Sequence, residues 1–263
     1  MNWGLVAGKD VRDSIRSRQL YVLCVLFGVT GVALAWTHAR QAGRGFADPL
    51  DIVRVLLVVA TVLVPATGLM LAHEAIVKPR TSGEYALLLG LPHSRLDLVA
   101  GTYAGRVTTL TISLVGGVVA TAAATALFGA TVPTVALGEF ALATAILGVA
   151  YVAIGIAVSA SVRSTTWAAV CAFGAFMLFI FLWRLVPGGV AYLVHGFEVP
   201  PTEPSWLPYV RALSPSVAYE QVAEAYVLEQ GSVVEPLYAL AVLVCWTCFA
   251  PVVGYLRFKR SDL

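Results

Sequence analysis

The sequence predicts an all-α membrane protein with six transmembrane helices, preceded by an interfacial helix and interrupted by a long segment between spans five and six. Of its 263 residues, 59% are hydrophobic and only 12% are charged, whereas soluble domains have about a quarter charged residues. The mean hydropathy is +0.84. Apolar residues gather in six runs, most of them near the roughly 20 residues that a helix needs to cross a bilayer. We therefore divide the chain into an interfacial helix, residues 1–19, and a six-span transmembrane domain, residues 20–263.

The N-terminal residues combine charged and apolar side chains at helical spacing. The apolar positions are Trp3, Val6, Ala7, Val11 and Ile15. The charged positions are Lys9, Asp10, Arg12, Asp13, Arg16 and Arg18. This pattern is typical of a helix that lies in the headgroup plane before the first span. The alternative is a basic tail that only adds solubility.

The six apolar runs define the spans. They cover residues 20–36, 52–72, 98–128, 139–160, 166–186 and 237–256. The third run is longer than a bilayer requires, so we expect its start to stand out of the membrane. Two connections are conspicuous: the charged insert at residues 78–97 and the long segment at residues 187–236.

The insert at residues 78–97 has helix signals at both ends. Thr81, followed three residues later by Glu84, forms a capping-box pattern, which predicts a short helix that starts there. Its apolar face and its end are given by Tyr85, Leu88, Leu89, Leu91 and Pro92. Ser94 and Asp97 repeat the capping pattern at the start of the third span. An ordinary loop with one solvated turn is the alternative interpretation.

Basic residues are distributed unevenly between the two sides of the membrane. Six spans place both chain ends on one side, and that side carries 12 of the 17 Lys and Arg residues. The twelve are Lys9, Arg12, Arg16, Arg18, Lys78, Arg80, Arg95, Arg106, Arg163, Arg257, Lys259 and Arg260. Because the cytoplasmic side is the more basic one, we expect a cell-membrane protein with cytoplasmic termini and a cytoplasmic insert. The net charge of +2 is too small to predict nucleic-acid binding.

The segment at residues 187–236 then lies on the outer side. Its prolines and aromatic residues make it too apolar for a disordered linker. The Ser214-Pro215 pair is a typical helix start, after which Ala218, Val222 and Tyr226 would share one face. This helix either dips back between the spans, lies on the interface, or belongs to a packed extracellular cap.

Motifs for enzymatic or cofactor chemistry are incomplete. No G-x-x-x-x-G-K-[ST] run is present to wrap the phosphates of a nucleotide. His73-Glu74 begins like a zinc-protease helix, but Val77 stands where the second histidine would be. The Cys245 and Cys248 pair matches C-x-x-C, although no neighbouring cation would favour a thiolate. We therefore expect this chain to have no catalytic residues and to bind no metal or other cofactor.

Small residues recur at four-residue spacing, which permits close helix approach within the chain or across a dimer. The pairs are Gly101 and Gly105, Ala120 and Ala124, and Gly155 and Ser159.

The layout resembles the membrane subunit of type-2 ATP-binding-cassette exporters over nearly the whole chain. In that family a glutamate ends the second span, and S-G, L-L-x-L-P-x-S-R-x-D and G-x-x-x-G follow it. The matching residues are Glu74, Ser82, Gly83, Leu88, Leu89, Leu91, Pro92, Ser94, Arg95, Asp97, Gly101 and Gly105. Arg163-Ser164 and Leu213-Ser214-Pro215 match shorter signals. Two positions depart from the pattern, because Glu84 and Thr102 stand where the family commonly has threonine and lysine.

The resemblance implies that residues 81–91 form a coupling helix, which docks on a separate ATPase subunit that binds ATP and Mg²⁺. It also implies a second permease copy, identical or paralogous, outward movement of a substrate, and a lid formed by residues 187–236. The implied docking residues are Thr81, Ser82, Gly83, Glu84, Tyr85, Leu88, Leu89, Leu91, Pro92 and Arg95. We expect Glu74 and Arg163 to serve as charges in gating or at helix ends.

Two other functional classes stay open. A membrane-embedded enzyme would centre on His73, Glu74 and the outer aromatic residues. A non-transporting assembly factor, for instance in metalloenzyme maturation, would use Cys245 and Cys248. The spans hold no charged or aromatic binding set, so the substrate is not determined by the sequence.

Overall fold

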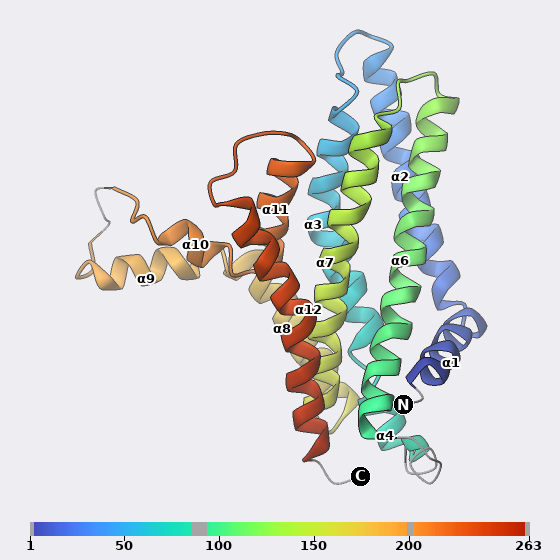
Figure 1. Ribbon diagram of the computed structural model, residues 1–263. Coiled ribbons are helices and arrows are strands. Elements are labelled where there is room, and N and C mark those ends of the chain that lie inside the picture. Colours follow the sequence, from blue (N-terminus) through green and yellow to red (C-terminus); the bar gives the residue numbers. More distant parts are fainter. Residues whose placement is uncertain (1–2, 86–93, 199–201, 261–263) are drawn as a thin grey trace.

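The computed structural model describes residues 3–85, 94–198 and 202–260, and within these ranges it contains helices and no strands (Figure 1). The helices before the middle of the chain are α1 (Trp3–Arg16), α2 (Gln19–Ala42), α3 (Asp51–Ala72), α4 (Val77–Thr81) and α6 (Arg95–Leu127). The later ones are α7 (Thr134–Ser161), α8 (Thr165–Met177), η1 (Leu178–Leu182), α9 (Val186–Val194), α10 (Leu207–Arg211), α11 (Pro215–Tyr226) and α12 (Pro236–Lys259).

Six helices in the described ranges are long and apolar enough to cross a membrane, which confirms the predicted fold class. The first span extends to Ala42, and the fourth begins at Thr134. The fifth consists of α8 and one π-helical turn, η1. We call the end of the bundle that carries α4 and both chain termini the inner end, and the end that carries the connection at residues 43–50 the outer end (Figure 1).

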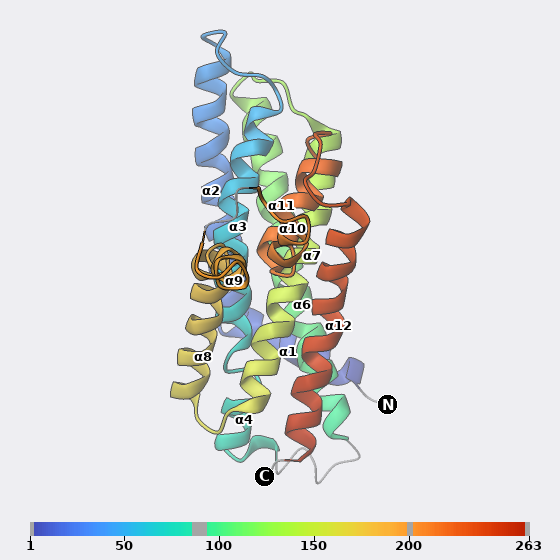
Figure 2. The same ribbon diagram turned by 90° about the vertical axis from the view of Figure 1, so that its left-hand side faces the viewer.

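Helix α7 forms the centre of the bundle. Of its most apolar stretch, 61% is buried, against 22% for α2 and for α8 with η1, which lie at the side (Figure 2). Small residues let α7 approach its neighbours closely: a Cβ on Gly155 would lie 2.6 Å from the Cβ of Ala72 on α3. Likewise, a Cβ on Gly254 of α12 would lie 2.9 Å from the Cα of Ala157. Without a hydrophobic driving force between helices in lipid, such contacts supply much of the packing energy.

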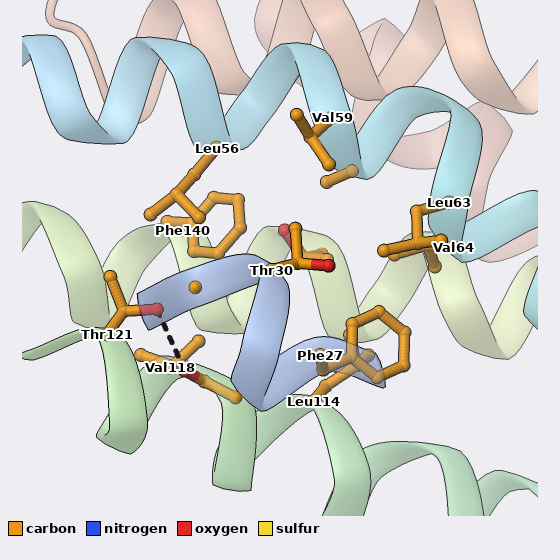
Figure 3. A pocket seen from close by; sticks show the side chains of 14 residues that line it. Phe27, Thr30, Leu56, Val59, Leu63, Val64, Leu114, Val118, Thr121 and Phe140 are labelled. Carbon is orange, nitrogen blue, oxygen red and sulfur yellow. Dashed lines mark hydrogen bonds between the residues drawn. The ribbon is translucent and has the colours of Figure 1, made fainter. Parts of the chain in front are cut away.

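The interior of the bundle is closely packed. A cavity of about 40 Å³ lies among α2, α3, α6 and α7. Figure 3 shows the side chains that line it, which are mainly apolar and include Phe27 and Phe140. The hydroxyl of Thr121 borders it but donates to the carbonyl of Gly117 at 2.8 Å. Pockets for drug-sized ligands have volumes of about 300–1,000 Å³, so this space is too small for such a solute.

Helix α1 crosses the inner part of α6 at the predicted small-residue pair. A Cβ on Gly101 would lie 2.5 Å from the Cβ of Val6 and 2.7 Å from the carbonyl oxygen of Trp3. A Cβ on Gly105 would lie 2.7 Å from the Cβ of Asp10. The close approach therefore occurs within the chain.

In its described residues, the segment at 187–236, which we call the outer segment, contains most of α9 and the short helices α10 and α11. Helices α9 and α10 project sideways from the bundle, whereas α11 lies beside α3, α7 and α12 (Figures 1 and 2). Helix α11 begins at Pro215 as predicted, and Ala218 and Val222 are buried. Tyr226, the last residue of α11, is 47% exposed.

Polar side chains hold α11 among the spans. The hydroxyl groups of Tyr151 and Ser216 lie 2.6 Å apart, and those of Thr144 and Tyr219 lie 2.9 Å apart. The indole of Trp246 donates to the carbonyl of Leu213 at 3.0 Å. Of the three arrangements that the sequence left open, the structure has the one in which the helix packs between the spans.

Replacement of Gly101 by alanine is expected to loosen α1. The new methyl group would meet the backbone of α1, and overpacking of this kind costs about 1–3 kcal/mol. We expect faster amide hydrogen exchange in residues 3–16 and a lower melting temperature. Gly116→Ala is the matched control on α6, where a Cβ would meet nothing within 4 Å. This control should be stabilised by up to about 1 kcal/mol through helix propensity, and equal effects of both variants would contradict the packing.

Candidate partner interface at the inner end

At the inner end, the connection between α3 and α6 contains a helix, α4, that the sequence did not predict, whereas the helix predicted over residues 81–91 lies mostly outside the described residues. Thr81 is the last residue of α4, and its hydroxyl donates to the carbonyl of Lys78 at 3.1 Å. The capping box of Thr81 and Glu84 is therefore not formed. Gly83 follows with φ of +78°, which glycine adopts without strain, and the chain is helical again at Glu84 and Tyr85. The predicted docking residues Leu88, Leu89, Leu91 and Pro92 lie outside the described residues.

The start of helix α4 is capped by a serine from another helix. The hydroxyl oxygen of Ser159, on α7, accepts hydrogen bonds from the amides of Ile76 and Val77, each at 3.0 Å. All three residues are fully buried. Unpaired amides at a buried helix start would be costly, so Ser159 makes this conformation possible.

A second contact joins α4 to the turn between α7 and α8. The guanidinium of Arg80 donates to the carbonyl of Val162. The next residue, Arg163, is exposed on this turn. Arg163, which we predicted as a helix-end charge, thus directly follows the residue whose carbonyl accepts the hydrogen bond from Arg80.

Two residues of the predicted docking set contact the end of α12. The ring of Tyr85, which is 3% exposed, packs edge-on against the ring of Phe258 with centroids 5.8 Å apart. The hydroxyl of Tyr85 donates to the carbonyl of Ala75 at 3.3 Å. The guanidinium of Arg95 donates to the carbonyls of Phe258 and Lys259 at 2.9 and 3.2 Å. Both side chains therefore connect the segment between α4 and α6 to the end of α12.

Glu84 connects the same segment to α1. Its carboxylate lies 2.5 Å from the ammonium of Lys9, with both side chains about half exposed. An exposed pair of this kind contributes at most about 1 kcal/mol, so it orients α1 more than it stabilises the fold.

A more buried ion pair lies beneath it, between α1 and α6. Arg106 approaches Asp10 to 3.1 Å, and their side chains are only 18% and 12% exposed. Arg106 also donates to the amide oxygen of Gln19 at 2.9 Å. Within the described residues, the second oxygen of Asp10 accepts no hydrogen bond. Burial therefore outweighs the attraction of Arg106 and raises the pKa of Asp10 to about 6.

Glu74 lies in the turn between α3 and α4. Its carboxylate is 40% exposed and lies 3.4 Å from the ammonium of Lys78, one helical turn on. His73 is 3.9 Å away, and its other ring nitrogen lies 3.0 Å from the carbonyl of Met70. Glu74 is thus an exposed charge at the end of a span.

The accessible part of the inner end is polar and basic. Its exposed residues include Lys78, Thr81, Ser82, Gly83 and Arg163, and we call these five the inner surface. Ser82 and Gly83 form the turn that ends α4. In the described part of the chain no three His, Cys, Asp or Glu residues are grouped to hold a metal, and Cys245 and Cys248 are exposed on α12.

Sequence reasoning missed Ser159, Asp10 and Arg106. Ser159 appeared only as a small residue paired with Gly155, and nothing local marked its hydroxyl as a cap for α4. Asp10 appeared only among the charged residues of the N-terminal helix. The available signal was that Val6, Asp10 and Ser14 share one face, since residues four apart in a helix do.

Comparisons with known proteins place the chain among transporters. A family model described as ABC-2 family transporter protein matches residues 5–263. A protein from Stutzerimonas stutzeri named "Probable ABC transporter permease protein NosY" is 29% identical over 271 residues, which covers 97% of each chain. A protein of the same name from Pseudomonas aeruginosa is 30% identical over 225 residues, which covers 82% of this chain and 79% of the relative.

Replacement of Ser159 by alanine is expected to release α4. Two buried amides would lose their acceptor, at a cost of about 1–3 kcal/mol. We expect faster trypsin cleavage after Arg80 with the spans intact. Ser161→Ala is the matched control, because the exposed Ser161 hydroxyl only donates to the carbonyl of Ala157 in its own helix. Unchanged cleavage in Ser159→Ala would show that the cap does not hold the segment.

The stability of the α1 contact is expected to depend on pH through Asp10. Its folded-state pKa of about 6 lies above the ordinary 3.8, so protonation stabilises the fold at low pH, and this stabilisation is lost as pH rises through 6. Between pH 5 and pH 7 the loss is about 1 kcal/mol. Thermal unfolding at both pH values should show this loss in the wild type and not in Asp10→Asn. Asp13→Asn, at a half-exposed position, should behave like the wild type.

Proposed function

Because this chain belongs to the ABC-2 family of transporter proteins and is similar throughout to ABC transporter permeases, we propose that it moves a substrate outward across the cell membrane with energy from a separate ATPase subunit. ATP and Mg²⁺ bind to that partner, and this chain supplies the moving part in the bilayer. The partner docks on the inner surface and on the adjoining residues 84–95.

The observation that carries this proposal is the way the inner end is joined to the spans. Ser159 ties the start of α4 to α7, and Tyr85 packs against the end of α12. Glu84 adds a contact to α1. A partner that pushes this segment would therefore move several helices as one body, which is the kind of element that transmits conformational change.

The positive charge of the inner surface supports its placement in the cytosol. Lys78 and Arg163 are exposed there, and the basic C-terminal residues Arg257 and Lys259 lie at the same end (Figure 1). Positive residues favour the cytoplasmic side. With this orientation the inner surface faces the compartment that contains ATP.

A second permease copy is supported by the closed interior. The cavity of about 40 Å³ among α2, α3, α6 and α7 is too small for a substrate, so these four helices do not enclose a path by themselves. Helices α2 and α8 with η1 are the least buried spans, and they offer apolar sides to a second copy. The outer segment, with α11 set among the spans, acts as the gate of this path.

The two other functional classes gain no support from the described residues. An enzyme would need polar groups that converge at one depth, whereas His73 is engaged by the Met70 carbonyl and Glu74 lies close to Lys78. A metal-handling factor would need ligands around Cys245 and Cys248, and no His, Asp or Glu completes such a group in the described ranges.

Co-purification of an ATPase tests the proposal. The tagged chain, isolated from its own cells in mild detergent, is expected to bring ATP hydrolysis with it. The double variant Leu88→Asp and Leu89→Asp should lose at least about tenfold of this activity, since charge in an apolar contact costs well over 1.4 kcal/mol. Leu127→Asp, at an 84% exposed position at the other end of α6, is the control. The proposal fails if no ATPase accompanies the wild type, or if the double variant keeps it.

A further inference from the structure

A cavity of about 660 Å³ lies near the outer end, between α3, η1 and α11. Its size is in the usual range for ligand sites. Helix α11 contacts both α3 and η1, so the cavity is bounded by the element that we propose as the gate. Its wall combines apolar side chains with four charged ones, Arg54, Arg184, Glu220 and Glu224.

The polarity of the wall changes along the membrane normal. On α3, Arg54, Val58 and Val62 follow one another at intervals of one turn, so the charge lies toward the outer end and the apolar residues toward the inner end. Along the fifth span, the apolar Phe181 in η1 comes before the charged Arg184, so here too the charged residue follows the apolar one toward the outer end. A molecule that fits this wall has a polar head and an apolar tail.

The charges at the head of the cavity do not balance. Arg184 lies 2.5 Å from Glu220, and Arg54 lies 2.6 Å from Asp51, so both cations already have a carboxylate partner. Glu224 accepts a hydrogen bond from the amide of Gln221 at 3.0 Å. Within the described residues no Lys, Arg or His nitrogen lies within ion-pair distance of Glu224. One carboxylate is therefore left without a cation.

This excess carboxylate selects the sign of the ligand. A cationic group can join Glu224 without breaking an existing pair, and the nearby carboxylate of Glu220 adds to the attraction. An anionic group would meet arginines that already pair with Glu220 and Asp51, and the Glu224 carboxylate would repel it. An uncharged head would leave Glu224 without a cation.

We propose that this cavity binds an amphiphile that carries an ammonium group, with the ammonium at Glu224 and the hydrocarbon part along Val58, Val62 and Phe181. If the transport function proposed above holds, on which this step rests, such amphiphiles are the substrate class. The ammonium comes either from a lipid headgroup such as phosphatidylethanolamine or from a free amphiphilic amine.

Photolabelling of the purified full-length chain in phosphatidylglycerol nanodiscs, whose lipid carries no ammonium group, tests the site. The probe is dodecylamine with a diazirine in its tail. Labelling is expected on peptides that contain residues 57–62 or 180–184. Unlabelled dodecylamine should compete, whereas dodecanol and dodecyl phosphate of the same chain length should not.

Glu224→Gln is expected to weaken labelling at least about tenfold, because it removes the charge and keeps the shape. Glu229→Gln is the matched control, five residues further along and exposed, and should label like the wild type. Equal labelling of Glu224→Gln and wild type, or equal competition by dodecanol, would overturn the proposal. Competition by phosphatidylethanolamine added to the nanodiscs indicates the lipid source, and competition by the free amine alone indicates the soluble one.

The ATPase complex separates failure of this site from failure of the transport function. Dodecylamine should stimulate ATP hydrolysis by the wild-type complex and not by the Glu224→Gln complex. Selective labelling without stimulation would reject the amphiphile as substrate. A complex that hydrolyses ATP while the chain fails to label would reject the site alone.

Discussion

Close approach of helices at small residues is the constraint on which the rest of the structure depends. Lipid tails are as apolar as leucine, so spans gain little from burying apolar side chains against one another and have to gain from contact. Helix α1 lies on Gly101 and Gly105, α3 on Gly155, and α12 brings Gly254 to α7. These approaches are near enough for short side chains such as Ser159 to reach the backbone of a neighbouring segment.

The inner end uses this proximity to become one unit. Hydrogen bonds from two amides to one buried hydroxyl, an aromatic contact to Phe258 and an ion pair to Lys9 join α4 and the residues after it to α7, α12 and α1. The buried amides of Ile76 and Val77 have an acceptor inside the chain, while Lys78 and Arg163 stay exposed. A rigid body whose exposed face is charged is suited to receive a push from a partner protein.

Helix α7 is the physical connection between the two ends. Near its inner end Ser159 caps α4, and nearer its outer end Tyr151 and Thr144 hold α11 through hydroxyl contacts of 2.6 and 2.9 Å. Because a helix transmits displacement along its axis, movement at the inner surface would reach α11 and the wall of the outer cavity. This places the proposed docking surface, gate and amphiphile site on one mechanical path.

The sequence by itself determined the features that rest on local signals. The lengths of the apolar runs defined six spans, and Ser94 and Asp97 formed the predicted capping box. Pro215 began the predicted helix, and another helix, α1, packs closely on Gly101 and Gly105. The family resemblance also came from local motifs. Only the tertiary structure decided that Thr81 ends a helix instead of starting one, that Asp10 is buried against Arg106, and that α11 packs between spans. In each of these cases the deciding partner comes from a distant part of the chain, such as Ser159 for α4, and local helix signals carry no information about which distant group will arrive to satisfy or bury a residue.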